Sequence, residues 1–331
     1  MSLKVLFIGG TGIISSACSE LAIERGIELY LLNRGQSSRP VPEGAKVLHG
    51  DIRNPDSVRA AIAGHNFDAV VDWIAFSTEN VETDIELFSG VTRQYIFISS
   101  ASAYQKPVAS QPITESTPLA NPYWGYSRAK IACEERLMRA YRESGFPATI
   151  VRPSHTYDRT ALPFLGGYTM IDRMRKGKKV FVQGDGTSLW VMTHHKDFAK
   201  GFVGLLGNPR TIGDAFQITS DEALTWNQIY EIFADAAGVK ADLVHVPSRV
   251  IGAFFPNWEE WLFGDRTHSV IFDNTKIKRI SPDFAATIPL SWGAKEVIEW
   301  YDADPARRVV DEQLNATIDL MIAAQESVRP Q

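Results

Sequence analysis

The sequence predicts an α/β protein built on a doubly wound parallel sheet, with a smaller α/β region towards the C-terminus. Short apolar runs rich in β-branched residues alternate with helical stretches through the first half of the chain, and a glycine-rich turn follows the first run. Strands that alternate with helices indicate βαβ units and a parallel sheet covered on both faces. Right-handed crossovers between such units produce a doubly wound fold.

The expected elements keep that alternating order. We expect strands at residues 5–8, 27–32, 69–73, 95–98 and 149–151, and helices between them at 15–24, 57–63, 81–88 and 126–143. After about residue 152 Pro and Gly become frequent and the alternation loosens, with further helices at 226–237 and 294–301. We therefore expect a smaller second region beside the sheet, to which it adds one or two strands.

The turn after the first strand reads GGTGIIS at residues 9–15 and leads into a helix. Glycine is needed where backbone amides approach a pyrophosphate without a Cβ in the way. The helix N-terminus adds unpaired N–H groups and a partial positive charge. Because the turn opens the first strand–turn–helix unit, we expect a dinucleotide site at Gly9, Gly12, Ile13 and Ile14, the alternative being a merely tight turn. Ser15 holds the third glycine position.

The end of the second strand bears on the choice of cofactor. An acidic residue there would bind the ribose 2′-hydroxyl and favour NAD. The chain has Asn33 and Arg34 instead, and Arg34 could pair with a 2′-phosphate or be a solvated turn residue. NAD or NADP is expected, with a lean towards NADP. Asp51 and Ile52 follow a further strand that we expect between the runs 27–32 and 69–73, at a position where an adenine contact is expected, although Asp51 could equally cap the next helix.

Tyr126 and Lys130 lie four residues apart, which places a phenol and an amine on one face of a helix. A nearby ammonium lowers a tyrosine pKa, so the pair could move a proton to or from a substrate hydroxyl. Ser99 and Ser100 end an expected strand, where doubly wound sheets place ligands. The YxxxK spacing is common by chance, so the prediction depends on its combination with the glycine turn and the serines.

These motifs resemble the extended short-chain dehydrogenases/reductases, the group that includes nucleotide-sugar epimerases and dehydratases. The resemblance covers roughly residues 3–305 and includes FISSASAY at 97–104, GDGT at 184–187 leading to HKD at 195–197, ITS at 218–220 and FDNTK at 272–276. It implies a Rossmann-like fold and an NAD(P)-dependent oxidoreductase or epimerase. Such an enzyme acts at a hydroxyl or carbonyl carbon of a sugar-like or other small substrate.

The resemblance also implies roles for single residues. Ser100, rather than Ser99, matches the catalytic serine or threonine of the family, and Tyr126 matches its acid/base. Lys130 matches the residue that binds the nicotinamide ribose, so Ser99, Tyr126 and Lys130 also belong to the expected cofactor site. Dehydratases of the family often have an Asp-Glu pair just after the catalytic residue, where this chain has Ala101 and Ser102. This difference counts against dehydration.

Other positions concern the nicotinamide and the substrate. Pro153 and His155 match the loop that meets the nicotinamide carboxamide and the substrate. Trp190 replaces an arginine that grips the diphosphate of nucleotide sugars; an indole cannot do so, but it could stack on a ring or belong to the core. Ser102 and His155 are candidate substrate contacts, and Arg266 is a candidate substitute charge.

Trp73 and Ile74 stand where the family usually has small residues against the cofactor. We expect them to remain part of the cofactor site, but to crowd that side or to shift the strand end.

These assignments divide the chain into three parts. Residues 1–152 are expected to form a dinucleotide-binding domain, to which 153–220 adds further sheet strands. Residues 153–310 mainly bind the substrate, and 311–331 form a C-terminal helix and tail. That helix presents Leu314, Ile318 and Ile322 as one stripe, which docks on its own core or makes a subunit contact.

Composition narrows the partners and the compartment. The net charge is −5, from 34 Lys and Arg against 39 Asp and Glu, which makes nucleic acid and anionic membranes poor partners. Cys18 and Cys133 lack a CxxC neighbour, and no apolar run is long enough to span a membrane. We expect a cytoplasmic protein, no metal at the adjacent His194 and His195, and a small-molecule substrate.

Two further expectations come from likeness to relatives. The resemblance implies a possible homodimer through the helix that holds Tyr126. The alternative to an enzyme is a non-catalytic NAD(P)-sensing or RNA-associated relative, because the Asn-Arg-Gly end of the second strand, residues 33–35, resembles that of plastid RNA-binding proteins.

Overall fold

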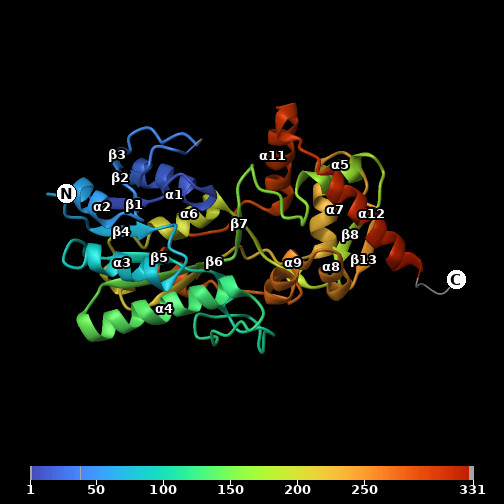
Figure 1. The fold of residues 1–331 in the computed structure, drawn as a ribbon. Coiled ribbons are helices and arrows are strands. Elements are labelled where there is room, and N and C mark those ends of the chain that lie inside the picture. The colour runs from blue at the N-terminus through green and yellow to red at the C-terminus, as the bar shows by residue number, and fades with distance from the viewer. Residues whose placement is uncertain (1, 38, 328–331) are drawn as a thin grey trace.

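A computed structural model describes residues 2–37 and 39–327. The chain forms a sheet-containing lobe and a second, C-terminal lobe, with β7 passing between them (Figure 1). The first lobe holds a seven-stranded parallel sheet in the order β11-β6-β5-β4-β1-β2-β3. Its strands are β1 (Lys4–Ile8), β2 (Glu28–Asn33), β3 (Lys46–His49), β4 (Ala69–Asp72), β5 (Tyr95–Ile98), β6 (Ala148–Pro153) and β11 (Ala215–Ile218). The predicted doubly wound α/β fold is confirmed.

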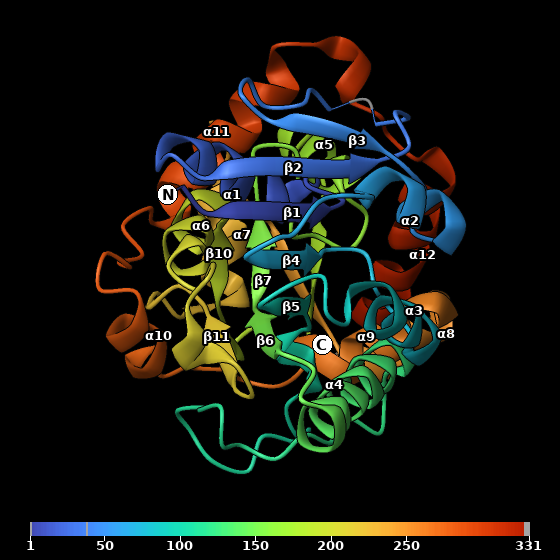
Figure 2. The same ribbon diagram turned by 90° about the vertical axis from the view of Figure 1, so that its left-hand side faces the viewer.

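Helices cover both faces of this sheet (Figure 2). Alternate side chains of a strand point to opposite faces, so Val5 and Phe7 of β1 pack with α1 and α6, whereas Leu6 and Ile8 pack with α2, α3 and α4. These helices are α1 (Ile13–Glu24), α2 (Pro55–Ile62), α3 (Thr78–Phe88), α4 (Gly125–Ser144) and α6 (His195–Val203). The near-continuous apolar strands in the sequence thus reflect burial from two sides.

The second lobe contains three short strand pairs surrounded by helices. The pairs are β7 (His155–Tyr157) with β10 (Met192–His194), β8 (Val180–Gln183) with β13 (Leu243–Val246), and β9 (Leu189–Trp190) with β12 (Leu224–Thr225). The helices of the remaining chain are α5 (Tyr168–Arg175), α7 (Trp226–Ala236), α8 (Ser248–Phe254), α9 (Pro256–Trp261), α10 (Thr275–Ile280), α11 (Leu290–Asp302) and α12 (Glu312–Ser327).

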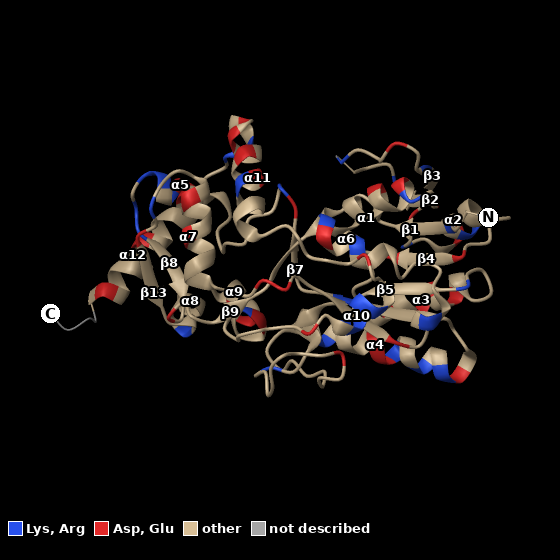
Figure 3. Cartoon of the chain, turned by 180° about the vertical axis from the view of Figure 1, so that it is seen from behind, with Lys and Arg blue, Asp and Glu red and all other residues tan. Residues whose placement is uncertain are grey.

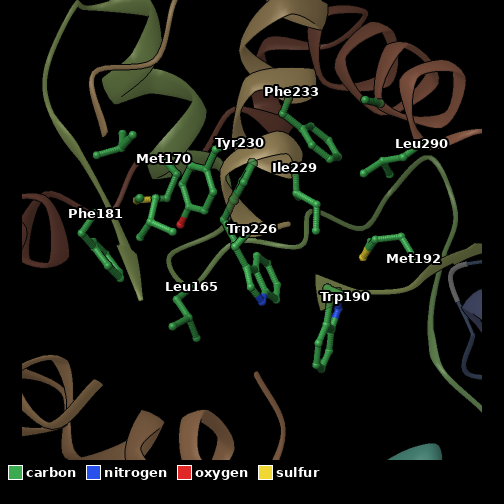
Figure 4. Close-up of a cluster of buried hydrophobic side chains, with 14 of the residues drawn as sticks. Leu165, Met170, Phe181, Trp190, Met192, Trp226, Ile229, Tyr230, Phe233 and Leu290 are labelled. Atoms are coloured by element: carbon green, nitrogen blue, oxygen red, sulfur yellow. The ribbon is translucent and has the colours of Figure 1, made fainter. Parts of the chain in front are cut away.

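Aromatic side chains fill the core of this second lobe. Trp226, Tyr230 and Phe233 of α7 point into it, and Trp190 lies beside Trp226 (Figure 4). Acidic and basic segments alternate along surface helices such as α4 (Figure 3). No helix in the described part of the chain is both long and apolar enough to cross a membrane.

The C-terminal helix α12 docks on its own chain. Ile318 and Ile322 are buried in the core of the second lobe, and Leu314 packs against it as a partly buried residue. The predicted stripe is therefore the face of α12 that packs on the core. The last four residues of the predicted tail, 328–331, lie outside the described residues.

Truncating the buried stripe of α12 should destabilise the protein. Ile318→Ala removes a fully buried side chain, and we expect it to lower the free energy of unfolding by about 2–5 kcal/mol. Leu320→Ala on the exposed face, where the side chain is 66% exposed, should change it by less than about 0.5 kcal/mol. Urea unfolding followed by circular dichroism measures both, and equal effects would show that α12 does not contribute its buried face to the core.

Candidate functional site

The glycine turn at the end of β1 leaves no room for a side chain at its first residue. Gly9 has φ +85°, and a Cβ at this residue would lie 2.8 Å from Ile74 Cγ2. The Ser15 hydroxyl donates to the Gly9 carbonyl at 2.9 Å and accepts from the Gly12 amide at 2.7 Å. Ser15 thus closes the turn with its side chain, a role that its small size alone did not indicate.

Helix α1 begins directly after Gly12 and has no acidic residue in its first turn. The amides of Ile13 and Ile14 belong to the turn of a helix whose N–H groups have no preceding helical carbonyl to bind. Gly12 is exposed, and a Cβ there would meet only the Ser15 hydroxyl at 3.2 Å. These residues fit a dinucleotide pyrophosphate placed at the helix N-terminus.

The expected adenosine end lies where β2 and β3 terminate. Arg34 is half exposed, and its guanidinium lies 3.9 Å from the Asp51 carboxylate. Asn33 accepts a hydrogen bond from the amide two residues on, which shapes the turn. Helix α2 is capped by Asn54 rather than by Asp51, so the Asp51 carboxylate is not used as a helix cap. Ile52 is half buried and packs against the sheet.

The side chains of Trp73 and Ile74, at the end of β4, lie in different surroundings. The Trp73 ring packs into the hydrophobic layer, with ring centroids 5.5 Å from Phe7 and 4.8 Å from Phe202. Ile74 remains 42% exposed and lies over Gly9. Of the two residues expected to crowd the cofactor side, Ile74 alone lies over the glycine turn, because Trp73 finds aromatic partners on the α6 side of the sheet.

The two serines after β5 point in different directions. Ser99 is buried and donates to Glu134, which is also paired with Arg152. Ser100 lines a cavity, and its hydroxyl lies 2.9 Å from the Ser102 hydroxyl. Ser100 therefore faces the cavity, whereas the Ser99 side chain is turned towards the buried ion pair.

Tyr126 and Lys130 lie on one face of α4, as their spacing predicts. Lys130 Nζ donates to the Ala75 carbonyl at 2.7 Å and to the Ile98 carbonyl at 2.8 Å, at the ends of β4 and β5. Its Nζ is 5.8 Å from the centre of the Tyr126 ring. This single amine therefore connects α4 to two neighbouring strands directly beneath the tyrosine.

The electrostatics of this pair differ from the expectation. Burial raises the pKa of the Tyr126 phenol, a hydrogen bond with Ser100 opposes the rise, and the charge of Asp265 adds to it. Burial also lowers the pKa of Lys130 to about 8, against the opposing effects of nearby acidic groups. The predicted lowering of the tyrosine pKa was wrong for the protein alone, because desolvation of the phenol outweighs the opposing hydrogen bond with Ser100.

A cavity of about 430 Å³ opens beside these groups at the carboxyl ends of β5 and β6. Ser100, Ser102, Tyr126, Pro153 and His155 all line it, together with Trp190. The structure thus brings together three serine and tyrosine hydroxyls and the predicted nicotinamide-side loop. Doubly wound sheets place their ligands at this edge.

Arg266 lies outside the cavity lining. Its guanidinium donates to the Pro163 carbonyl at 2.6 Å and lies 4.7 Å and 4.1 Å from the rings of Trp226 and Trp261. Burial lowers the pKa of His155 to about 3, and the Arg266 charge contributes to that shift. His155 is therefore a neutral imidazole at physiological pH, and Arg266 acts on it from behind the cavity wall.

Sequence reasoning missed part of the cavity lining. The missed residues include polar and aromatic side chains from separate segments of the chain: Lys106, Trp124, Trp261, Asp265 and Phe272. Trp124 had a signal, because it directly precedes the helix of Tyr126. Phe272 also had one, because it opens the FDNTK motif at 272–276. Lys106, Trp261 and Asp265 had none that was local, since their meeting depends on how the second lobe folds onto the first.

Comparison with known proteins places this geometry in a family. The model of the NAD dependent epimerase/dehydratase family matches residues 5–219. A 2′-dehydrokanamycin reductase of Streptomyces kanamyceticus is 26% identical over 99% of this chain and 92% of its own length. The chloroplast stem-loop binding protein of 41 kDa b of Arabidopsis thaliana is 26% identical over 73% of this chain and 65% of its own length.

A solved structure shares the fold. The dTDP-glucose 4,6-dehydratase of Bacillus anthracis, determined in complex with NAD, aligns with a TM-score of 0.73 at 18% identity and covers 92% of this chain and 98% of that chain. The predicted resemblance to the extended short-chain dehydrogenases/reductases is confirmed. The chain belongs to the NAD-dependent epimerase/dehydratase family of enzymes.

Proposed function

We propose that the protein transfers hydride reversibly between NAD(P) and a carbinol or carbonyl carbon of a small, sugar-like substrate, with Ser100, Tyr126 and Lys130 as the reacting set. The observation that supports this most strongly is the shared cavity: the Ser100 and Tyr126 hydroxyls line it together, and Lys130 lies beneath them between β4 and β5. The glycine turn lies at the same edge of the sheet. Ile74 lies over Gly9, and the carbonyl of the next residue, Ala75, accepts a hydrogen bond from Lys130.

Each residue has one task in the proposed reaction. When bound, the nicotinamide supplies hydride to the carbonyl carbon or accepts it from the carbinol carbon. In reduction, Tyr126 gives its phenolic proton to the carbonyl oxygen as the new C–H bond forms; in oxidation it takes the hydroxyl proton back. Ser100 holds that oxygen by a hydrogen bond. Lys130 donates to the nicotinamide ribose and favours the phenolate that remains on Tyr126.

The protonation state of the free protein suits reduction. Burial raises the pKa of the Tyr126 phenol, so the phenol holds near neutral pH the proton that reduction consumes. A relative matched along 92% of its own length is named a reductase. Epimerisation would need hydride to return to the opposite face of the same carbon. Dehydration is disfavoured, because Ala101 stands where a dehydratase would have an acid.

NADP is the proposed cofactor, with NAD as the alternative. Arg34 is exposed at the end of β2, and its only acidic neighbour in the described part of the chain is Asp51 at 3.9 Å. At this distance the ion pair is weak, so a 2′-phosphate could take the place of the Asp51 carboxylate as the partner of Arg34. A homodimer through α4 stays a prediction.

Loss of the Tyr126 hydroxyl should abolish turnover but spare cofactor binding. With 2′-dehydrokanamycin and NADPH or NADH as the first reaction tested, we expect Tyr126→Phe to lower kcat by at least about 100-fold, because a positioned general acid contributes that much. Tyr123→Phe, on the exposed turn before α4, is the matched control and should stay near wild type. If Tyr126→Phe is as active as wild type, the proposed reacting set is wrong.

An RNA-binding module would give a different pattern. Such a protein would bind an RNA stem-loop in a gel shift, and Tyr126→Phe would not change that binding. It would bind none of the four nicotinamide nucleotides in calorimetry. That combination would replace the enzyme proposal by the alternative that the 41 kDa stem-loop binding relative represents.

The Arg34 side chain should decide between the two cofactors. Arg34→Ala should raise the Kd for NADPH by about tenfold or more through the loss of charge-assisted hydrogen bonds, and leave the Kd for NADH unchanged. Arg53→Ala, also exposed and two residues beyond Asp51, is the control. Isothermal titration calorimetry measures all four combinations, and an equal loss for both nucleotides would contradict the NADP assignment.

Cofactor affinity should fall as Lys130 loses its proton. Its pKa of about 8 means that the ammonium is present below this pH and lost above it. We expect the Kd for NADPH to rise by up to about tenfold between about pH 7 and about pH 9. Lys130→Met should bind more weakly and lack this dependence on pH. A flat wild-type profile, measured by nucleotide fluorescence, would show that the Lys130 charge does not contribute to binding.

A further inference from the structure

A charged pair in the cavity wall has no task in the proposed hydride transfer. Lys106 Nζ lies 3.8 Å from Asp265 Oδ1, which is longer than a direct hydrogen bond. The Lys106 side chain is 1% exposed, and its Nζ has no hydrogen-bond partner among residues 2–37 and 39–327. A buried ammonium without hydrogen bonds is costly. Lys106 is therefore an unused donor at a cavity.

The backbone holds both members of the pair in place. The Lys106 amide donates to the Ala120 carbonyl at 2.8 Å, in a short antiparallel contact that begins at Tyr104. Asp265 lies on a π-helical turn, Leu262–Arg266, a local geometry that is frequent at functional sites. Burial lowers the pKa of Lys106 and raises that of Asp265, each partly opposed by the other. A ligand that forms hydrogen bonds with both side chains would offset the cost of burying their charges.

The charges that line the cavity restrict which charge its ligand can have. Its titratable groups are Lys106, Asp265, Tyr126 and His155. Tyr126 is a neutral phenol and His155 a neutral imidazole near pH 7, so one cation faces one anion. Arg266 is held behind the wall by the Pro163 carbonyl. A diphosphate with two negative charges therefore meets no surplus positive charge in this cavity.

The remaining wall is aromatic. Trp124, Trp190 and Trp261 all line the cavity, and the rings of Trp124 and Trp261 lie 6.5 Å apart. Indole faces pack well against the apolar C–H face of a saturated ring, while a few convergent polar groups fix its orientation. An acceptor oxygen for Lys106 and a donor hydroxyl for Asp265 must then sit on neighbouring atoms of that ring, because the two charged groups are themselves neighbours.

We propose that Lys106 and Asp265 are the substrate-recognition pair of this enzyme, and that the cavity takes a hydroxylated ring without a phosphate group. Lys106 donates to one ring oxygen, Asp265 accepts from the hydroxyl beside it, and the tryptophans pack against the ring faces. The ring then presents its reacting carbon to Ser100 and Tyr126. The inference rests on the proposed function for the last step alone; recognition by the pair does not depend on turnover.

Binding measured with the cofactor already bound tests this inference. The wild-type protein saturated with NADPH, or with NADH if that binds more tightly, is titrated with kanamycin, methyl α-glucoside and UDP-glucose. Quenching of tryptophan fluorescence and calorimetry report on binding. We expect at least one phosphate-free ring to bind, and UDP-glucose to show no binding at millimolar concentration. Tighter binding of UDP-glucose, or no binding of either ring, would overturn the proposal.

Variants separate recognition from catalysis. Lys106→Met and Asp265→Asn should each raise the Kd for the ring by about tenfold or more, because each leaves a buried partner unpaired. Both should keep wild-type affinity for the cofactor. Lys240→Met removes an exposed lysine elsewhere and is the matched control. Thermal unfolding checks that the variants fold; Lys106→Met should lower the midpoint, because it leaves the buried Asp265 carboxylate without its cation.

The outcomes distinguish the two proposals. Unchanged ring affinity in both folded variants would show that the pair does not recognise the substrate. If the ring binds and the variants lose it, but no hydride transfer occurs with any cofactor, the recognition inference stands and the proposed reaction fails. If the wild-type protein binds no nicotinamide nucleotide at all, the proposed function fails before the ring is tested, and titration of the ring without cofactor decides the recognition inference alone.

Discussion

The site depends on one buried amine. Lys130 Nζ binds the carbonyls that follow β4 and end β5, and so holds the start of α4 against the sheet at the edge where ligands are placed. Without those two hydrogen bonds an ammonium in this position would be costly. With them, the face of α4 that holds Tyr126 is kept in register with Ser100, and the rest of the cavity is built around that contact.

Desolvation sets the protonation states of the surrounding groups. It keeps Tyr126 a phenol and makes His155 a neutral imidazole, and it lowers the pKa of Lys130 to about 8, close to physiological pH. A hydroxyl-rich cavity results, in which the charges of Lys106 and Asp265 oppose each other. Such an environment favours proton transfer between neutral oxygens and offers little to a highly charged ligand.

The sequence predicted the sheet and the placement of Tyr126 and Lys130 on one helix face, because these features are local. The glycine turn, the helix spacing of Tyr126 and Lys130, and the apolar strands each contain their structural reason within a few residues. Trp73 was harder to place, because its orientation depends on Phe202 of a distant helix. Lys106 and Asp265 could not be paired from the sequence, because a loop of the first lobe and a turn of the second meet only in the folded chain.

Ser15 has a consequence for the entropy of binding at the glycine turn. Its hydroxyl donates to one backbone group of the turn and accepts from another, so the turn has its shape without a ligand. Preorganised sites spend less of their binding free energy on ordering. A ligand that enters this turn therefore does not have to order its backbone, and more of the contact energy is left to hold the ligand.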